Sequence, residues 1–158
     1  MTTLPAAVVV TVLSLFPIMN PLGNLPAFLA LTSGEPEQRR RAQARRTALY
    51  CAVLLIVFAL AGQPLLHALG ISLPSLQIAG GLIVGHTAFT MVINGPRLTD
   101  DERAFSETKT DISFSPMALP LLAGPGALGV VIGLASRSQG VAPLLGIVLG
   151  SLVMSLVV

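Results

Sequence analysis

Residues 16–26, Phe-Pro-Ile-Met-Asn-Pro-Leu-Gly-Asn-Leu-Pro, interrupt an apolar segment that is otherwise long enough to cross a lipid bilayer. A proline inside a helix removes a backbone donor and clashes with the preceding turn, which costs ~3 kcal/mol or more. An unpaired backbone group in lipid is also costly, so a break at this depth persists only where protein or a polar cavity covers it. The two asparagines in the break, Asn20 and Asn24, therefore indicate a site inside the membrane.

Composition is typical of a polytopic helical membrane protein. Hydrophobic residues make up 53% of the 158 residues, charged residues only 10%, and the mean hydropathy is +0.83. A soluble domain carries roughly a quarter charged residues. Apolar runs of about 20 residues supply five spans and leave no stretch for a separate soluble domain. We therefore predict an all-α transmembrane bundle that occupies residues 1–158 as a single domain.

Five spans are expected along the chain, and they cover about residues 5–31, 47–66, 74–94, 112–135 and 141–158. Gln63-Pro64 is expected to mark the end of the second span, because proline does not continue a helix without cost. The charged run at residues 35–46 is expected to be a solvated loop or a helix start. The single cysteine, Cys51, is expected to be an apolar residue of the second span.

Lys and Arg are distributed unevenly between the connecting segments. Residues 35–46 hold five arginines and the loop 95–111 holds three basic residues, whereas the link at 70–72 holds none and the turn at 136–140 holds Arg137 alone. By the positive-inside rule, residues 35–46 and the loop 95–111 are expected to be cytoplasmic. The prediction is a multi-pass protein of the plasma membrane with its N-terminus outside.

A second proline-glycine break lies in the fourth span. Pro120 and the triplet Gly124-Pro125-Gly126 lie there, and this span crosses in the direction opposite to the first. Three spans per repeat would invert the second repeat, so we predict an inverted repeat with its broken helices meeting near the midplane. Repeat one covers about residues 1–95, and a partial repeat two covers about residues 112–158.

Local chemistry predicts how each break restarts a helix. Asn24 is a good N-cap with Pro26 in the first turn, and Gly124 followed by Pro125 is a similar start signal. Two helix N-termini at up to ~2 kcal/mol each, with charge-assisted hydrogen bonds of ~1.5–3 kcal/mol each, offset the ~2.5–3.5 kcal/mol cost of a carboxylate at the bilayer centre. The predicted substrate-binding residues are Asn20, Pro21, Gly23, Asn24, Gly124, Pro125 and Gly126. The alternative is a structural kink at each break, because Gly and Pro are common in membrane helices.

Other polar and small residues in the spans can be interpreted as functional or as structural. His86 and Thr87, in the middle of the third span, are a candidate secondary site for proton coupling or solute contact. The alternative, which we favour, is a neutral histidine bonded to a neighbouring helix. Three Gly-x-x-x-Gly motifs permit close helix contact, and through them copies of the chain could associate. They begin at Gly81, Gly129 and Gly146.

The sequence lacks the residues and motifs that several kinds of catalytic and ion-binding site require. The expected spans contain no Asp, Glu, Lys or Arg, and the chain has no His-Glu-x-x-His, Gly-x-Ser-x-Gly or phosphate-binding glycine loop. We therefore expect no enzyme, no cofactor, no metal and no nucleic-acid partner. The expected partners are the lipid bilayer and a small-molecule solute.

Residues 16–26 resemble the first-span signature of the MarC family of bacterial and archaeal inner-membrane proteins. Ile78-Ala79-Gly80-Gly81-Leu82-Ile83 is similar to that family's third-span segment, and residues 116–127, Pro-Met-Ala-Leu-Pro-Leu-Leu-Ala-Gly-Pro-Gly-Ala, resemble its fourth-span signature. The resemblance covers nearly the whole chain and implies a multi-span inner-membrane protein. Some members of the family are described as transporters of small neutral amino acids such as glycine and alanine. Members usually have six spans, so the last span is missing from the five expected here.

The leading hypothesis is a transporter of a small neutral solute, bound near the bilayer midplane between two discontinuous helices. Asn20 and Asn24 would hydrogen-bond the solute, while Gly23 and Gly126 would let backbone N–H groups approach it. The alternatives are a non-transporting membrane scaffold and a passive channel. A scaffold would depend on the glycine motifs and tolerate loss of the asparagines, whereas a channel would pass solute without coupling to an opposing solute.

Overall fold

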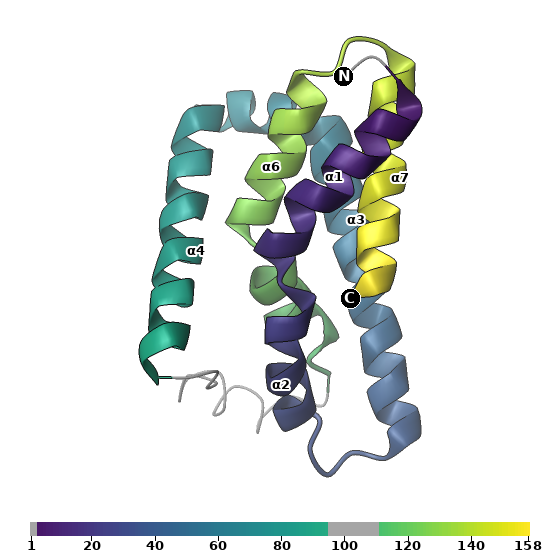
Figure 1. The fold of residues 1–158 in the computed structure, drawn as a ribbon, viewed down its shortest axis with the longest axis vertical. Helices are drawn as coiled ribbons and strands as arrows, with labels where there is room; N and C mark the ends of the chain where they lie inside the picture. Colours follow the sequence, from purple (N-terminus) through teal and green to yellow (C-terminus); the bar gives the residue numbers. More distant parts are fainter. Residues whose placement is uncertain (1–2, 95–110) are drawn as a thin grey trace.

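The computed structural model of the protein describes residues 3–94 and 111–158, and within these residues the chain is helical without strands. The predicted loop at 95–111 lies, apart from Asp111, outside the described residues. The helices follow the expected order of spans (Figure 1), with two of the spans each divided into a pair. They are α1 (Leu4–Met19), α2 (Pro21–Leu31), α3 (Glu37–Ala68), α4 (Leu73–Asn94), η1 (Ser113–Leu122), α6 (Pro125–Ser136) and α7 (Val141–Val157).

The helices have the length and surface of a membrane bundle. α3 is long and apolar enough to cross a membrane, and so is each of the pairs α1–α2 and η1–α6 when taken as one bent span. α4 has 22 residues with no charged side chain, and α7 is a shorter apolar helix of 17 residues. Large apolar side chains such as Leu82 (69% exposed) and Leu156 (83% exposed) face outward, as expected where lipid replaces water. The predicted transmembrane helical bundle with broken first and fourth spans is confirmed.

Two helix pairs pack closely through small residues. A Cβ atom on Gly146 of α7 would lie 2.6 Å from the Ala7 Cβ of α1, and one on Gly133 of α6 would lie 2.7 Å from the Gln77 Nε2 of α4. Close contact at these two glycine motifs is therefore confirmed. Gly81 and Gly85 of α4 have no such neighbour within 4 Å in the described part of the chain, so contact at that motif stays a prediction. α4 stands at one edge of the bundle beside α6 (Figure 1).

The buried core is shared by five of the helices. Its largest members come from α1, α3, η1, α6 and α7, and Cys51 is fully buried among them, which confirms its expected place in an apolar span. These core residues include Leu15, Met19, Leu55, Leu122, Val131, Ile147 and Met154.

α3 is longer at both ends than the expected second span. The charged run is its start, with Glu37 in the first turn and an exposed ion pair between Glu37 and Arg41 one turn later. The expected end at Gln63-Pro64 is wrong, because the helix continues to Ala68. A proline removes one helical donor, and here the next turn still closes, since Leu69 N–H donates to the Leu65 carbonyl at 3.1 Å.

Candidate functional site

The first break is made by Asn20, which joins α1 to α2 at a bend of 48°. Asn20 adopts the left-handed conformation (φ 43°, ψ 60°), which asparagine tolerates better than most residues. Its side-chain Oδ1 accepts the N–H of Gly23 at 3.1 Å, so it caps α2. A Cβ atom on Gly23 would lie 2.1 Å from Asn20 Nδ2, so only glycine leaves room for this cap.

The predicted cap was placed one turn too late in the chain. Asn20 rather than Asn24 is the N-cap, and Pro21 rather than Pro26 occupies the first helical position. Pro21 has no N–H to satisfy and its ring fixes the φ that a first turn needs. Asn24 and Pro26 therefore lie inside α2, where Asn24 has a different role.

Asn24 supplies donors to carbonyl groups that both breaks leave without a helical partner. It is buried, with 7% of its surface exposed, and its Nδ2 donates to Met19 O at 3.0 Å and to Leu121 O at 3.4 Å. In an uninterrupted helix the Met19 carbonyl would accept from Gly23, whose N–H binds Asn20 instead. The Leu121 carbonyl would accept from Pro125, which has no N–H. One amide thus links the two breaks.

The second break is made by backbone geometry and proline. Within η1, Ser115 (φ −131°) and Leu119 (φ −130°) are extended, as residues before a proline tend to be. α6 starts at Pro125 with Gly124 as its N-cap, and the bend between η1 and α6 is 64°. The predicted start at Gly124 and Pro125 is confirmed. No side chain caps this helix, and a Cβ atom on Gly124 would lie 2.5 Å from Pro120 O.

The two broken spans run in opposite directions, and their breaks lie at the same level in the middle of the bundle (Figure 1). A Cβ atom on Gly126 would lie 3.3 Å from the Ile18 Cγ2 of α1 and 2.9 Å from the Val84 Cγ2 of α4. A Cβ atom on Gly80 of α4 would lie 2.8 Å from Gly126 Cα. The first turn of α6 thus lies beside the last turn of α1 and in close contact with α4.

Two hollows flank the breaks. The first, which we call the Asn24 cavity, has a volume of about 40 Å³. Its lining comes from α2, α3 and η1, with the last residue of the chain: Pro21, Asn24, Leu25, Phe28, Ala44, Thr47, Met117, Leu122 and Val158. The second, which we call the Gly126 groove, has a volume of about 270 Å³. Its lining is apolar except for Gln77, and comes from α1, α4 and α6: Ile18, Gln77, Gly80, Gly81, Val84, Gly126 and Val130.

The predicted site residues are brought together at the breaks, but they divide between the two hollows. Pro21 and Asn24 line the Asn24 cavity and Gly126 lines the groove, whereas the other four shape the backbone and line neither. Those four are Asn20, Gly23, Gly124 and Pro125. Among the predicted residues, Asn24 is therefore the one whose polar side chain lines a hollow, and it lies where both broken helices meet.

His86 and Thr87 lie apart from the breaks. Both side chains are exposed on α4, and the Thr87 hydroxyl donates to Ile83 O at 3.0 Å within its own helix. Among the described residues, His86 has no hydrogen bond to a neighbouring helix, and neither residue lines a hollow. The favoured reading of a histidine bonded to another helix therefore finds no partner in this part of the chain.

Sequence reasoning missed the contribution of α3 to the Asn24 cavity. Thr47 is 3% exposed, lines the cavity and donates its hydroxyl hydrogen to Ser113 O at 3.2 Å. A signal was present, because Gln43 and Thr47 are polar residues four positions apart, which places them on one face of a helix. That face begins within the arginine run, at Gln43, and continues just past it, at Thr47.

Comparison with known proteins gives one family. A family model described as "MarC family integral membrane protein" matches residues 6–158. The membrane protein YvbG of Bacillus subtilis is 32% identical over 142 residues, which are 87% of this chain and 67% of that protein. The inner membrane protein MarC of Escherichia coli is 35% identical over 129 residues, or 77% of this chain and 58% of that protein.

A third relative, from an archaeon, shows the same pattern. The membrane protein MJ1677 of Methanocaldococcus jannaschii is 37% identical over 118 residues, which are 73% of this chain and 57% of that protein. The chain thus spans between 57% and 67% of the length of these three relatives. No solved structure matches the chain.

Proposed function

The chain belongs to the MarC family of integral membrane proteins, and from this premise we propose that it carries a small neutral solute across the membrane. The solute class we propose is a small amino acid such as glycine or alanine. It would bind where the two broken helices meet, beside Asn24. Because the chain spans only part of the length of its relatives, the proposal concerns the part of a carrier that these residues form.

The observation that carries the proposal is the position of Asn24. A buried amide that joins two helix breaks in the middle of a membrane bundle is costly to keep, since polar groups in lipid need partners. Polar residues and interrupted helices at this depth commonly mark a transport pathway. The Asn24 amide, near the start of α2, offers a donor for a solute carboxylate, which can take the place of one of the two carbonyl groups that accept from Asn24 Nδ2.

The lining of the site favours a solute without net charge. No side chain that lines the Asn24 cavity or the Gly126 groove is ionisable, so no side-chain charge is available to balance a net charge on the solute. A zwitterion fits better, because helix N-termini attract its carboxylate while carbonyl oxygens at the breaks accept from its ammonium group. Met19 and Leu121 carry two such carbonyl groups, which would exchange Asn24 Nδ2 for the solute as donor.

The size of the Asn24 cavity favours a small solute. A buried water needs ~10–15 Å³ of such volume, so the cavity of about 40 Å³ has room for a few heavy atoms. Glycine or alanine needs only a slight widening of this space, whereas leucine needs a rearrangement of Phe28 or Leu122, which line it.

Uptake into proteoliposomes tests the proposal. We expect saturable uptake of labelled glycine and alanine above that of empty vesicles, and much slower uptake of leucine. The Asn24→Leu variant should lose about tenfold or more of the rate, because a buried hydrogen-bonding group is removed. Thr90→Val is the matched control, since within the described residues the Thr90 hydroxyl donates to Thr87 O of its own helix.

Three results would contradict the proposal. These are glycine and alanine uptake no faster than in empty vesicles, uptake that does not saturate, and equal uptake by the Asn24→Leu and Thr90→Val proteins. Thermal unfolding in detergent, measured on each variant, separates a lost binding group from a protein that does not fold.

A further inference from the structure

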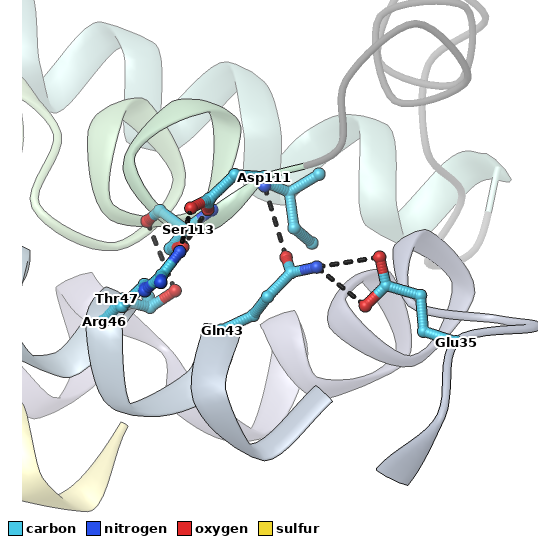
Figure 2. Close-up of polar contacts among 7 residues, drawn as sticks. Glu35, Gln43, Arg46, Thr47, Asp111 and Ser113 are labelled. Atoms are coloured by element: carbon cyan, nitrogen blue, oxygen red, sulfur yellow. Dashed lines mark hydrogen bonds and ion pairs between the residues drawn. The ribbon is translucent and has the colours of Figure 1, made fainter. Parts of the chain in front are cut away.

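A polar cluster outside the breaks ties three elements together at the end of the bundle where α3 begins (Figure 2). The Glu35 carboxylate, in the turn after α2, accepts two bonds from Gln43 Nε2, at 2.8 and 2.7 Å. The Oε1 of the same glutamine accepts the N–H of Ile112, just before η1, at 3.2 Å. One side chain of α3 therefore holds both the end of α2 and the start of η1.

Asp111 forms the second half of this arrangement (Figure 2). Arg46 Nη1 of α3 lies 2.6 Å from Asp111 Oδ2, and Asp111 Oδ1 accepts the Ser113 N–H at 2.9 Å and also its hydroxyl. The bonds from Ser113, with a smaller contribution from Arg46, hold the pKa of the Asp111 carboxyl below its ordinary value. Thr47 completes the set by donating to Ser113 O. We call these residues the Gln43 cluster: Glu35, Gln43, Arg46, Thr47, Asp111 and Ser113.

The elements held by the Gln43 cluster are the elements that enclose the Asn24 cavity. α2, α3 and η1 contribute all the lining of the cavity except Val158, and Thr47 belongs to both the lining and the cluster. If α2 and η1 moved away from α3, the cavity would open toward this end of the bundle. The contacts that oppose such a movement at this end include the hydrogen bonds and the ion pair of the cluster.

The breaks provide the hinges for that movement. α2 is joined to α1 only through Asn20, and η1 is joined to α6 through Ala123 and Gly124. Hinges are a few residues at the ends of elements that absorb changes in backbone angle. The two half-helices that border the cavity are therefore the two that each have a break at one end and the Gln43 cluster at the other.

The chemistry of the cluster suits a contact that opens and closes. Gln43 is 5% exposed and Thr47 is 3% exposed, so their polar groups need partners while the cluster is closed. On opening, water can replace each of these bonds, because the cluster lies at the charged end of α3 among exposed arginines. Asn24, by contrast, is 7% exposed and donates to backbone groups of the two breaks, away from the charged end of α3.

We propose that the Gln43 cluster is a latch that closes the Asn24 cavity toward the end of the bundle where α3 begins. Release of the latch admits water and solute to the cavity from that side. The assignment of the cavity to a solute rests on the proposed function, whereas the opening itself is a property of the fold. The two are therefore tested by different measurements.

Thiol labelling of the cavity tests the latch without any transported solute. Met117 of η1 is buried and lines the cavity, so Met117→Cys in a Cys51→Ala background reports access from water. In membranes open to a charged, membrane-impermeant maleimide on both sides, we expect slow labelling with the latch intact. Gln43→Leu removes the bonds to Glu35 and Ile112 and should raise the labelling rate by about tenfold, the change expected for the loss of about 1.4 kcal/mol from the closed state.

Two further variants keep the test decisive. Asp111→Asn weakens the pairing with Arg46 at a partly exposed position that should not impair folding, and it should raise labelling about two- to threefold, as for the loss of an exposed ion pair. Arg41→Ala is the matched control, because the Glu37–Arg41 pair lies within α3 alone, and its labelling rate should not change. Thermal unfolding in detergent identifies a variant that does not fold.

The latch is overturned if labelling is unchanged in folded Gln43→Leu protein. Should that variant not fold, unchanged labelling in Asp111→Asn overturns the latch. Faster labelling in the latch variants but not in Arg41→Ala supports it, even if no uptake of glycine is found, in which case the proposed function alone fails. Saturable uptake together with unchanged labelling in the latch variants would support the proposed function and overturn the latch.

Discussion

The two breaks in the bundle reach the same result by different chemistry. At the first, Asn20 and Asn24 use side-chain atoms to replace backbone partners that the bend removes. At the second, proline removes a donor, and Gly124 and Gly126 let Pro120 O and the Val84 side chain approach closely. The comparison teaches that a membrane helix can be interrupted either by adding polar atoms or by removing bulk. The two breaks should therefore fail under different substitutions.

The largest expected effect comes from adding bulk beside the second break. A Cβ atom on Gly80 would lie 2.8 Å from Gly126 N and Cα, which are backbone atoms that have little freedom to move. We expect Gly80→Val to lower the free energy of unfolding by ~3 kcal/mol, at the upper end of overpacking effects. Denaturant unfolding in detergent micelles measures it.

The neighbouring glycine offers the matched control for bulk. Gly81 has nothing within 4 Å of its Cβ position among the described residues, so Gly81→Val should change the free energy of unfolding by less than ~0.5 kcal/mol. Equal effects of the two valine substitutions would show that α4 and α6 are not in close contact at Gly80.

Removing polar atoms from the first break should have the next largest effect. Asn24→Leu deletes the donor to Met19 O and Leu121 O and should lower the free energy of unfolding by ~1–3 kcal/mol, since buried carbonyl groups lose a partner. Thr90→Val, which deletes a bond within an exposed helix face, should cost less than ~0.5 kcal/mol. If the two variants unfold alike, Asn24 does not link the breaks.

Substitutions at the two N-cap residues test the contrast between the breaks. Asn20→Ala removes a side-chain cap and should cost ~1 kcal/mol, whereas Asn20→Gly should cost only a few tenths. At the second break Gly124→Ala should cost at least ~1 kcal/mol, because its Cβ would lie 2.5 Å from Pro120 O. Thermal unfolding of the three proteins in one detergent gives the ranking. If Gly124→Ala left the unfolding temperature unchanged while Asn20→Gly lowered it strongly, the roles given to both N-cap residues would be wrong.

The smallest expected effect is the pH dependence at Asp111. Hydrogen bonds from Ser113 lower the pKa of this carboxyl in the folded protein, so its contribution to stability is present above the ordinary pKa of an aspartate. That contribution is lost as the pH falls through the lower, folded-state pKa. The difference in unfolding temperature between the wild-type and Asp111→Asn proteins should therefore shrink in acid. A difference that grows as the pH falls would show that Asp111 is not stabilised as a carboxylate.

Much of this architecture could be predicted from local features of the sequence. Apolar length predicted the spans, and Pro-Gly clusters predicted which two are broken. The choice between Asn20 and Asn24 as the cap could not be predicted, because each precedes a proline by one or two positions. The choice depends on the left-handed conformation of Asn20 and on the Leu121 carbonyl, 97 residues from Asn24.

The Gln43 cluster could not be predicted from the sequence for a similar reason. Gln43 and Thr47 show a polar face on α3, but the N–H that Gln43 binds belongs to Ile112, 69 residues away. Nothing local to Gln43 identifies a backbone group as its partner. His86 is the reverse case, since its position in mid-span suggested a role, while the structure places its side chain on an exposed face of α4.

Cross-linking across the Asn24 cavity is the measurement that tests most directly whether the two interruptions meet. Leu25 of α2 and Leu122, the last residue of η1, both line this small cavity, whereas Leu22 is 74% exposed and does not. In membranes, with Cys51→Ala as background, the Leu25→Cys and Leu122→Cys pair should be joined in high yield by a short bifunctional thiol reagent, and the Leu22→Cys and Leu122→Cys pair should not. Equal yields for the two pairs, or no cross-link in the first, would contradict the meeting of the breaks on which the carrier proposal depends.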